Sequence, residues 1–426
     1  MKKLNKATSL KGIISVPGDK SISHRALMLG AIADGTTRIT NLLNSADVNT
    51  TKQILMDLGV KITEQANITE VEGHGVSGLH DPDEVLDMGN SGTSTRLLTG
   101  LIVGAGLNAR IIGDDSLSKR PMDRVINPLS NVGANISSNN GKLPTTIHQS
   151  HLKSKIDFEL PIGSAQVKSA VLLAGVTSGA ETTVVDEFKT RNHTEVMLQQ
   201  FGAEVKIDGA KISIPSDQHL SAANVVVPGD ISSAAFWIVA GLLVKDSDLM
   251  IKNVGINSTR SGVIEILNQM NAMVDIQASN SDGEPIADIT PHFSKLKAIN
   301  ISGKVIPACI DEIPIIVLAA TRATGRTIIK DAAELKLKES DRIITVTTEL
   351  KKLGAKIQAT DDGFIIDGPV QLKADKTHVS GHKDHRIAMM LTIASLITDG
   401  EVILDDDDSV DISYPTFFHE LGKLVV

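Results

Sequence analysis

The stretch LGAKI, at residues 353–357, ends an amphipathic helical pattern and passes directly into a short strand pattern. Glycine directly after the last helical turn suits the C′ position, where a positive φ costs it little. Related tags occur six times, once with asparagine in place of glycine and once cut short by the C-terminus. They begin at Leu58, Val132, Phe201, Met270, Leu353 and Leu421. The strand patterns that follow alternate apolar and polar residues, so the sequence predicts a repeated helix–strand unit.

A second kind of helix recurs before each tag. It is apolar on all sides, is rich in small residues and has a polar N-terminus. The six helices are expected to begin at Ser23, Thr93, Ser164, Ile231, Asp311 and Asp384, about 67 to 80 residues apart. A helix that is apolar all round belongs in the interior, enclosed by sheets and outer helices. We therefore expect an α/β (α+β) protein with two domains of three units each, divided near residues 225–229.

The composition is that of a soluble globular protein, with 41% hydrophobic and 22% charged residues among 426. A net charge of −9 and an aromatic content of 2% argue against a nucleic-acid partner. No apolar run approaches the roughly 18 residues of a membrane span, and the N-terminus lacks the apolar core of a signal peptide. The single cysteine, Cys309, fits a reducing compartment. We expect a cytoplasmic protein that has no membrane partner.

Polar residues concentrate at the openings of the apolar helices. These openings contain glycine, serine or threonine, and they lie at residues 17–25 (PGDKSISHR), 88–96 (MGNSGTSTR), 163–166 (GSAQ) and 229–233 (GDISS). Free N–H groups, the helix dipole and a nearby cation together suit a phosphate or a carboxylate. Ordinary helix capping explains any single opening equally well.

Several cations lie near these openings or in similar polar stretches of an acidic protein. They are Lys20, Arg25, Arg96, Arg120, Arg191, Lys338, Arg342 and Arg386. Each alone fits a surface ion pair, but together they indicate a pocket for a multiply anionic small molecule. Neither P-loop nor dinucleotide-binding spacing occurs, so ATP and NAD are not indicated. No spacing of ligands resembles a calcium loop or a zinc site, and we expect no metal.

Two acidic positions stand beside cations. Asp311 and Glu312 open the fifth apolar helix, and residues 338–342 (KESDR) place five polar residues before another helix. A carboxylate held against a cation can move protons in a reaction on a phosphorylated substrate. A surface ion pair is the alternative for Glu339. Cys309 lies in an apolar stretch and is interpreted as a packed thiol.

Six motifs, in order along the whole chain, resemble the 5-enolpyruvylshikimate-3-phosphate synthase family, in its second bacterial class. They lie at residues 17–25, 89–96, 119–122 (KRPM), 164–169 (SAQVKS), 338–342 and 384–386 (DHR). The resemblance implies an enolpyruvyl transferase-like fold, an inverse α/β barrel or prism with three βαβαββ repeats in each of two domains. It implies one discontinuous domain of residues 1–18 and 229–426, an inserted domain of residues 19–228, and an active site in the cleft between them.

The reaction implied by the resemblance moves the enolpyruvyl group of phosphoenolpyruvate to the 5-hydroxyl of shikimate 3-phosphate. It releases phosphate and needs no metal or organic cofactor. The resemblance implies shikimate 3-phosphate contacts from Lys20, Ser21, Arg25, Ser164, Gln166, Arg191, Asp311 and Lys338. It implies phosphoenolpyruvate contacts from Lys20, Gly92, Arg120, Gln166, Arg342 and Arg386. Asp311 would take the hydroxyl proton, Glu339 would deliver a proton to the methylene carbon, and Lys20 would meet both substrates.

Three positions depart from patterns known in the family. Residues 410–415 (VDISYP) offer no lysine to phosphoenolpyruvate, Leu97 stands where the first class has proline, and Ser91 replaces a common alanine. Gly92 has no side chain to crowd the herbicide glyphosate, which mimics phosphoenolpyruvate, so we expect inhibition by glyphosate. The sequence indicates no extended apolar interface, and a monomer is expected.

Two other functions compete with this interpretation. The related transferase that acts on UDP-N-acetylglucosamine carries a reactive cysteine in the loop after its second buried helix, but residues 114–120 (DDSLSKR) contain none. A non-catalytic anion-binding protein would gain nothing from the acids Asp311 and Glu339. Substrates held between two domains also imply closure, with a hinge expected near residues 18–20 and 228–229.

Overall fold

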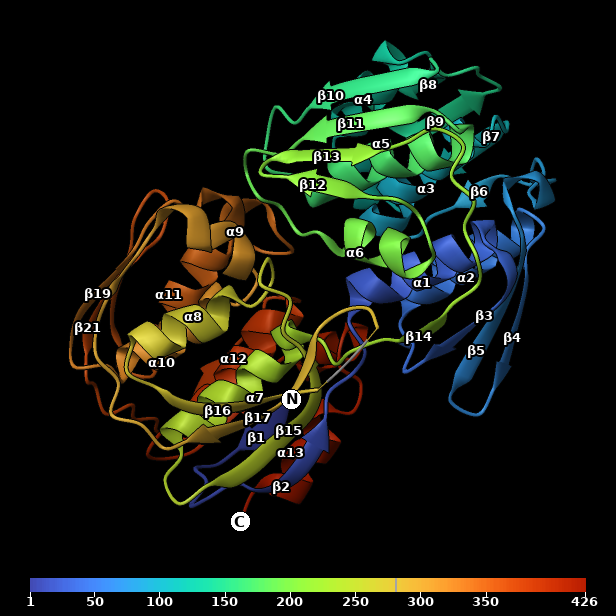
Figure 1. The fold of residues 1–426 in the computed structure, drawn as a ribbon. Helices are drawn as coiled ribbons and strands as arrows, with labels where there is room; N and C mark the ends of the chain where they lie inside the picture. Colours follow the sequence, from blue (N-terminus) through green and yellow to red (C-terminus); the bar gives the residue numbers. More distant parts are fainter. Residues whose placement is uncertain (280–281) are drawn as a thin grey trace. The chain divides into compact units, whose positions relative to one another are not determined.

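The computed structural model describes residues 1–279 and 282–426 and divides into two compact units (Figure 1). Of the described residues, unit 1 contains 1–17, 228–279 and 285–426, and unit 2 contains 18–227 and 282–284. Within these residues the strands form five four-stranded sheets and one three-stranded sheet. The fold class predicted from the sequence, a mixed α/β protein built from repeats, is confirmed.

One repeat of unit 2 displays the shared plan. Its elements are β6 (Leu86–Asp87), α3 (Gly92–Gly104), β7 (Ala109–Ile112), α4 (Asp123–Asn131), β8 (Asn135–Asn139) and β9 (Lys142–His148). The first two strands are parallel and flank the buried helix, and the last two form an antiparallel hairpin. The sheet order is β6-β7-β9-β8, which is a βαβαββ unit. The next repeat follows the same plan with β10 (Lys155–Glu159), α5 (Ala165–Ser178), β11 (Glu181–Val185), α6 (His193–Gln200), β12 (Lys206–Asp208) and β13 (Lys211–Ile214).

The third repeat of unit 2 borrows its first strand from a distant part of the chain. Its elements are β14 (Asn224–Val226), α1 (Lys20–Ile32), β3 (Asp34–Thr40), α2 (Ala46–Asp57), β4 (Lys61–Gln65) and β5 (Ile68–His74). The strand that precedes α1 along the chain, β2 (Lys11–Ser15), belongs to unit 1. The parallel position beside β3 is therefore taken by β14.

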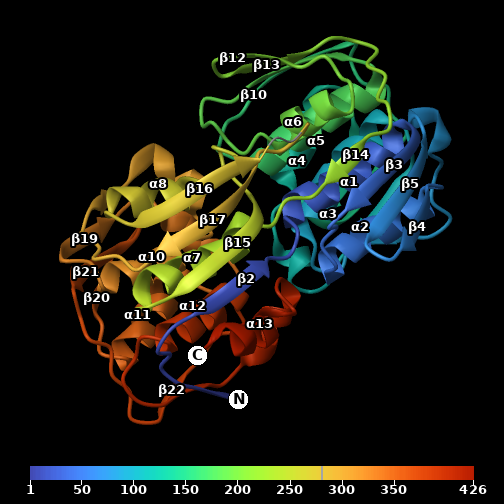
Figure 2. The same cartoon turned by 60° about the horizontal axis from the view of Figure 1, so that its bottom comes forward.

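Unit 1 contains the complementary arrangement. Strand β2 pairs in parallel with β15 (Asp248–Gly255), and Figure 2 shows the two strands side by side. That repeat continues with α7 (Ile231–Leu243), α8 (Gly262–Gln269), β16 (Met273–Ser279) and β17 (Ile286–His292). The next repeat contains β18 (Asn300–Ile301), α9 (Ile306–Cys309), α10 (Ile313–Thr321), β19 (Gly325–Ile329), α11 (Arg342–Lys352), β20 (Lys356–Ala359) and β21 (Phe364–Gly368).

The last repeat is completed by the N-terminus. It contains β22 (Thr377–Val379), α12 (His385–Ser395), β23 (Val402–Leu404) and α13 (Phe417–Leu424). Strand β22 is parallel to β23, and β1 (Lys2–Leu4) pairs antiparallel on the other side of β23. The two ends of the chain thus close one sheet of unit 1.

The apolar helices form the two cores, as the sequence predicts. Helices α1, α3 and α5 lie in the core of unit 2, and α7, α10 and α12 lie in the core of unit 1. All residues of α7 and α10 are buried. The fifth of these helices begins at Ile313 and is capped by Glu312, two residues later than expected from the sequence.

The helix-ending tags adopt the predicted left-handed conformation in five of six cases. The positive φ values are 98° at Gly59, 112° at Gly133, 90° at Gly202, 66° at Asn271 and 87° at Gly354. The prediction for the sixth tag is wrong, because Gly422 lies inside α13, which continues to Leu424. Helix α13 leads into no further strand, so the chain needs no left-handed turn at this point.

Helices α3 and α5 pack with their backbones in close contact. A Cβ atom added to Gly100 would lie 2.1 Å from the carbonyl oxygen of Ala170. A Cβ atom added to Gly104 would lie 2.1 Å from Thr177 Oγ1 and 2.3 Å from the carbonyl oxygen of Ala174. These two glycines set the distance between the helices that carry Gly92 and Gln166.

The variant Gly100→Ala should therefore destabilise the protein, because its new methyl group meets backbone rather than a flexible side chain. We expect the free energy of unfolding to fall by about 1–3 kcal/mol or more. The control Gly422→Ala should be neutral or raise it by up to about 1 kcal/mol, because nothing lies near this helical glycine. Urea unfolding followed by circular dichroism measures both, and equal stability of the two variants would contradict the close packing of α3 and α5.

Candidate active site

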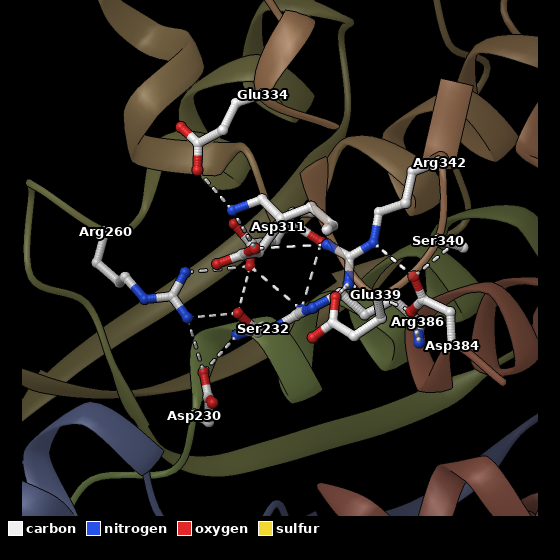
Figure 3. Close-up of polar contacts among 12 residues, drawn as sticks. Asp230, Ser232, Arg260, Asp311, Glu334, Glu339, Ser340, Arg342, Asp384 and Arg386 are labelled. Carbon is white, nitrogen blue, oxygen red and sulfur yellow. Dashed lines mark hydrogen bonds and ion pairs between the residues drawn. The ribbon is translucent and has the colours of Figure 1, made fainter. Parts of the chain in front are cut away.

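A polar cluster lies in unit 1, where the openings of its helices meet (Figure 3). Helices α7, α10 and α12 pack against one another, so their N-termini supply neighbouring polar groups. Asp230 caps α7, Asp384 caps α12 and Asp341 caps α11, each by accepting backbone N–H groups. Such caps hold the side chains of the first helical turn in fixed positions.

Arg342, in the first turn of α11, is the centre of this cluster. Its Nε donates to Asp384 Oδ2 at 2.8 Å and its Nη2 donates to Glu339 Oε2 at 2.6 Å. Its Nη1 lies 3.5 Å from Asp311 Oδ1. Burial disfavours the charge of this side chain, which is 1% exposed, but Glu339, Asp384 and Asp311 outweigh burial and raise its pKa. The guanidinium is therefore charged at every pH at which the protein is folded.

Glu339 is accessible to solvent, with 47% of its side chain exposed. Its partial burial would raise its pKa, but the guanidinium of Arg342 outweighs this and lowers the pKa below its ordinary value. Glu339 is consequently ionised at neutral pH in the free protein. It can accept a proton in this state, and it can donate one only after Arg342 is drawn toward another anion.

Asp311 lies between two cations immediately before α10. Lys338 Nζ is 3.6 Å and Arg342 Nη1 is 3.5 Å from Asp311 Oδ1. Lys338 also donates to Glu334 Oε1 at 2.7 Å. The Asp311 side chain retains 15% exposure, so a ligand can reach its carboxylate.

Glu312 organises a second, more deeply buried group beside Asp311. Its Oε1 accepts hydrogen bonds from the hydroxyl of Ser232 and from Arg260 Nη1, the latter at 3.1 Å. Arg386 Nη1 lies 3.7 Å from the same oxygen and donates to the carbonyl oxygen of Asp311 at 3.3 Å. Arg260 and Ser232 were not predicted as site residues from the sequence. Ser232 lies in one of the polar helix openings at residues 229–233, whereas Arg260 lies in a polar loop with no recognisable pattern.

Arg25, a buried cation of unit 2, has hydrogen-bond partners that are neutral rather than acidic. Arg25, in α1, donates to Thr194 Oγ1 at 2.8 Å, to Ser169 Oγ at 2.7 Å and to the carbonyl oxygen of Ser21 at 2.9 Å. Burial lowers the pKa of Arg25 to about 10, so it is charged at neutral pH. Within the described part of the chain it forms no ion pair, and an anionic ligand would compensate its charge.

A second group of cations surrounds the opening of α3. Arg96 Nη1 donates to Gln166 Oε1 at 2.6 Å, and Arg120 Nη2 donates to Asn90 Oδ1 at 2.6 Å. A Cβ atom added to Gly92 would lie 3.0 Å from Arg96 Nη1 and 3.4 Å from Arg120 Nη1. Burial, reinforced by Arg120, lowers the pKa of Arg96 to about 10. Among the residues described, neither arginine has a carboxylate partner, so this group has positive charge that could pair with an anion.

The remaining predicted residues lie at helix openings of the same unit. Lys20, in the first turn of α1, forms an ion pair with Asp47 of α2. Ser164 caps α5, accepting the backbone N–H of Val167 at 3.4 Å, and lies two residues before Gln166. Arg191 lies in the loop between β11 and α6.

Ser91 does not offer its hydroxyl to a ligand. The side chain is fully buried, accepts the backbone N–H of Ser94 at 3.2 Å and contacts Ser94 Oγ at 2.6 Å. The structure thus brings Ser21 to Arg25, Gln166 and Gly92 to the arginines at α3, and Lys338, Glu339 and Asp311 to Arg342. It does not bring Ser91 into the anion sites.

Three other features bear on the interpretation of the sequence. Cys309 is fully buried and burial raises the pKa of its thiol, in agreement with a packed cysteine. Over residues 1–279 and 282–426, no three histidine, cysteine or acidic side chains are grouped as metal ligands. The same ranges contain no helix long and apolar enough to cross a membrane.

Comparison with known proteins identifies the family. The model of EPSP synthase (3-phosphoshikimate 1-carboxyvinyltransferase) matches residues 4–421. A 3-phosphoshikimate 1-carboxyvinyltransferase of Geobacillus kaustophilus is 49% identical over 98% of both chains. One of Bacillus cytotoxicus is 49% identical over the full length of both.

Solved structures agree with these sequence relatives. EPSP synthase from Acinetobacter baumannii superimposes with a TM-score of 0.91 at 41% identity, over 100% of this chain and 98% of that one. The enolpyruvyl transferase NikO from Streptomyces tendae shares the fold, with a TM-score of 0.80 at 19% identity over 99% and 96% of the two chains. The resemblance inferred from six motifs is confirmed: the chain belongs to the EPSP synthase family, the 3-phosphoshikimate 1-carboxyvinyltransferases.

Proposed function

We propose that the acids of the unit 1 cluster and the cations of unit 2 act together on one pair of substrates. The reaction is that of the family: the enolpyruvyl group of phosphoenolpyruvate passes to the 5-hydroxyl of shikimate 3-phosphate, and phosphate leaves. The observation that carries the proposal is the pairing of two carboxylates, Asp311 and Glu339, with the single guanidinium of Arg342. This arrangement supplies a base, an acid and an anion site at one point.

Shikimate 3-phosphate is assigned to the Arg25 site. Its phosphate brings the negative charge that the buried guanidinium lacks, and Ser21, Ser164 and Arg191 are placed at neighbouring helix openings or loops. Bidentate arginine contacts are well suited to phosphate. Lys20, Gln166, Lys338 and Asp311 complete the proposed contacts of this substrate.

Phosphoenolpyruvate is assigned to the arginines around Gly92 and to Arg342 and Arg386. It carries a carboxylate and a phosphate, and the close approach of Arg96 and Arg120 to Gly92 supports an anion at that opening. Gln166 contacts Arg96 and, with Lys20, is proposed to reach both substrates. Residues 410–415 contain no lysine, and Arg96, beside Gly92, supplies positive charge near the same substrate.

The proton transfers follow from the chemistry of addition and elimination. As the 5-hydroxyl oxygen attacks C2 of phosphoenolpyruvate, Asp311 takes the hydroxyl proton and Glu339 gives a proton to the methylene carbon. The resulting adduct then loses phosphate, which carries away the proton held by Asp311, and a methyl proton returns to Glu339 to restore the double bond. Phosphoenolpyruvate that pairs with Arg342 weakens the ion pair of Glu339, so the pKa of Glu339 rises from its lowered resting value.

The proposal also includes inhibition by glyphosate, a cytoplasmic location and a monomeric state. Glyphosate is an anion of similar shape to phosphoenolpyruvate and is expected at the Gly92 opening. The buried, reduced Cys309 fits the cytoplasm. Contributions from both units to one substrate pair also make domain closure part of the proposed cycle, with the chain crossings at residues 17–18 and 227–228 as its hinge.

Replacing the base should reduce turnover far more than binding. For Asp311→Asn we expect kcat to fall by about 10²–10⁴-fold, while the calorimetric Kd of shikimate 3-phosphate changes by less than about tenfold. The assay is phosphate release from phosphoenolpyruvate, with shikimate 3-phosphate or UDP-N-acetylglucosamine as the acceptor. Asp367→Asn, which breaks an exposed ion pair with Arg326, is the control and should keep full activity. Unchanged turnover in Asp311→Asn would mean that another group is the base, whereas no turnover in the parent would support a binding protein.

The Gly92→Ala variant should weaken inhibition by glyphosate and raise the KM of phosphoenolpyruvate, because the new methyl group meets Arg96 and Arg120. The neighbouring control Ser91→Ala should leave the inhibition constant unchanged. It should lower the free energy of unfolding by about 1 kcal/mol through loss of a helix cap. Steady-state inhibition against phosphoenolpyruvate separates the two variants. If Gly92→Ala is inhibited as strongly as the parent, the steric role of Gly92 is wrong.

Shikimate 3-phosphate alone should compact the molecule if its contacts come from both units. Small-angle X-ray scattering with and without this ligand measures the radius of gyration, and Asp311→Asn should show the same decrease because it retains binding. A radius that stays constant at saturating ligand would argue against closure.

A further inference from the structure

We infer that Lys168, a buried lysine of α5, is a positioning residue for shikimate 3-phosphate that acts through Arg25 and through the loop carrying Arg191. The inference rests on the proposed function, because it assigns these two arginines to that substrate. Nothing in the six motifs marks Lys168 as more than a helical residue between Gln166 and Ser169.

Lys168 holds three segments of unit 2 together. Its ammonium group lies 2.9 Å from Asp186 Oδ2 and 2.7 Å from Glu195 Oε1, and it donates to the carbonyl oxygen of Thr190 at 3.1 Å. The residue is 1% exposed, and both carboxylates are buried. A lysine without solvent is retained only where all its hydrogen-bonding capacity is used, and here its three donors meet three acceptors.

The link to Arg25 runs through adjacent residues on two helices. Ser169 follows Lys168 in α5, and Thr194 precedes Glu195 in α6. The Lys168–Glu195 ion pair fixes the two helices so that Ser169 Oγ and Thr194 Oγ1 are 2.7 Å apart. These are the two hydroxyls that receive Nη2 and Nε of Arg25. Because the acceptors are neutral, the guanidinium is held in place and keeps its charge for a ligand.

The link to Arg191 runs through the loop after β11. Asp186 accepts the backbone N–H of Phe188 at 3.1 Å and of Thr190 at 2.9 Å, and the hydroxyl of Thr190 at 2.6 Å. Lys168 fixes this folded loop from the other side by binding both Asp186 and the carbonyl oxygen of Thr190. Arg191 is the next residue, so the direction in which it leaves the loop depends on the lysine.

A buried ion pair can also serve stability alone, and the experiment must separate the two roles. The first variant is Lys168→Met, which keeps the length of the side chain but removes its charge. The second is Thr194→Val, which keeps the shape and removes the hydroxyl that contacts Arg25 and Ser169. The stability control is Ile147→Ala, which removes buried apolar contacts in strand β9 of the same unit, where no residue is assigned to a substrate.

Calorimetry should show the Kd of shikimate 3-phosphate raised by about 10- to 100-fold in Lys168→Met and by about tenfold in Thr194→Val. The KM of phosphoenolpyruvate and kcat, both at saturating shikimate 3-phosphate, should change by less than about threefold. Ile147→Ala should bind shikimate 3-phosphate as the parent does, although its urea midpoint falls. Rescue is tested with Lys168→Arg, which restores a cation and should recover part of the affinity.

The inference is overturned if folded Lys168→Met binds shikimate 3-phosphate as the parent does, or if Ile147→Ala loses affinity to the same extent. If Lys168→Met does not fold, Thr194→Val decides: a parental Kd rules out positioning through the hydroxyls. These outcomes leave the enzyme active and differ from failure of the proposed function. If the proposed function fails, the parent protein itself releases no phosphate with shikimate 3-phosphate.

Discussion

The structure depends on one constraint: helices that are apolar on every side must be enclosed. Each unit encloses three such helices with sheets and amphipathic helices. The charged residues of these helices lie near their N-terminal ends, because the rest of each helix is in the core. N-termini offer free N–H groups and positive potential, so enclosure of the helices also concentrates anion-binding groups. The site is thus a product of the way the core is built.

The two units balance charge in opposite ways. In unit 1 the guanidinium of Arg342 is surrounded by Asp311, Glu339 and Asp384, whereas in unit 2 Arg25 rests on hydroxyls and a carbonyl oxygen. An anion entering unit 2 supplies charge that is missing. An anion entering unit 1 has to compete with resident carboxylates. In the proposed function, that competition frees those carboxylates to exchange protons and so couples binding to chemistry in unit 1.

The sequence predicted the parts of the molecule that are encoded locally. Glycine after a helix, apolar stretches and cations at helix openings are visible within ten residues, and the Glu339–Arg342 pair is three residues apart. Contacts between distant segments were not predictable: Arg260 meets Glu312, and Lys168 meets Glu195, only because the fold brings them together. The lowered pKa of Glu339 also required the structure, since a glutamate near an arginine in sequence need not touch it. The predicted left-handed turn at Gly422 is wrong because this tag, unlike the other five, is not followed by a strand.

The exchange of strands β2 and β14 sets an order on biosynthesis. As the chain leaves the ribosome, β2 has no partner until β15 has been made, more than 200 residues later. Strand β1 has no partner until β23 (Val402–Leu404) has been made. All but three residues of unit 2 lie in one uninterrupted stretch, 18–227. The nascent protein therefore completes one core while its first strands remain single. Unit 1 can complete its sheets only after β23 has been made, and a chain released before that point lacks the partner of β1 and β22.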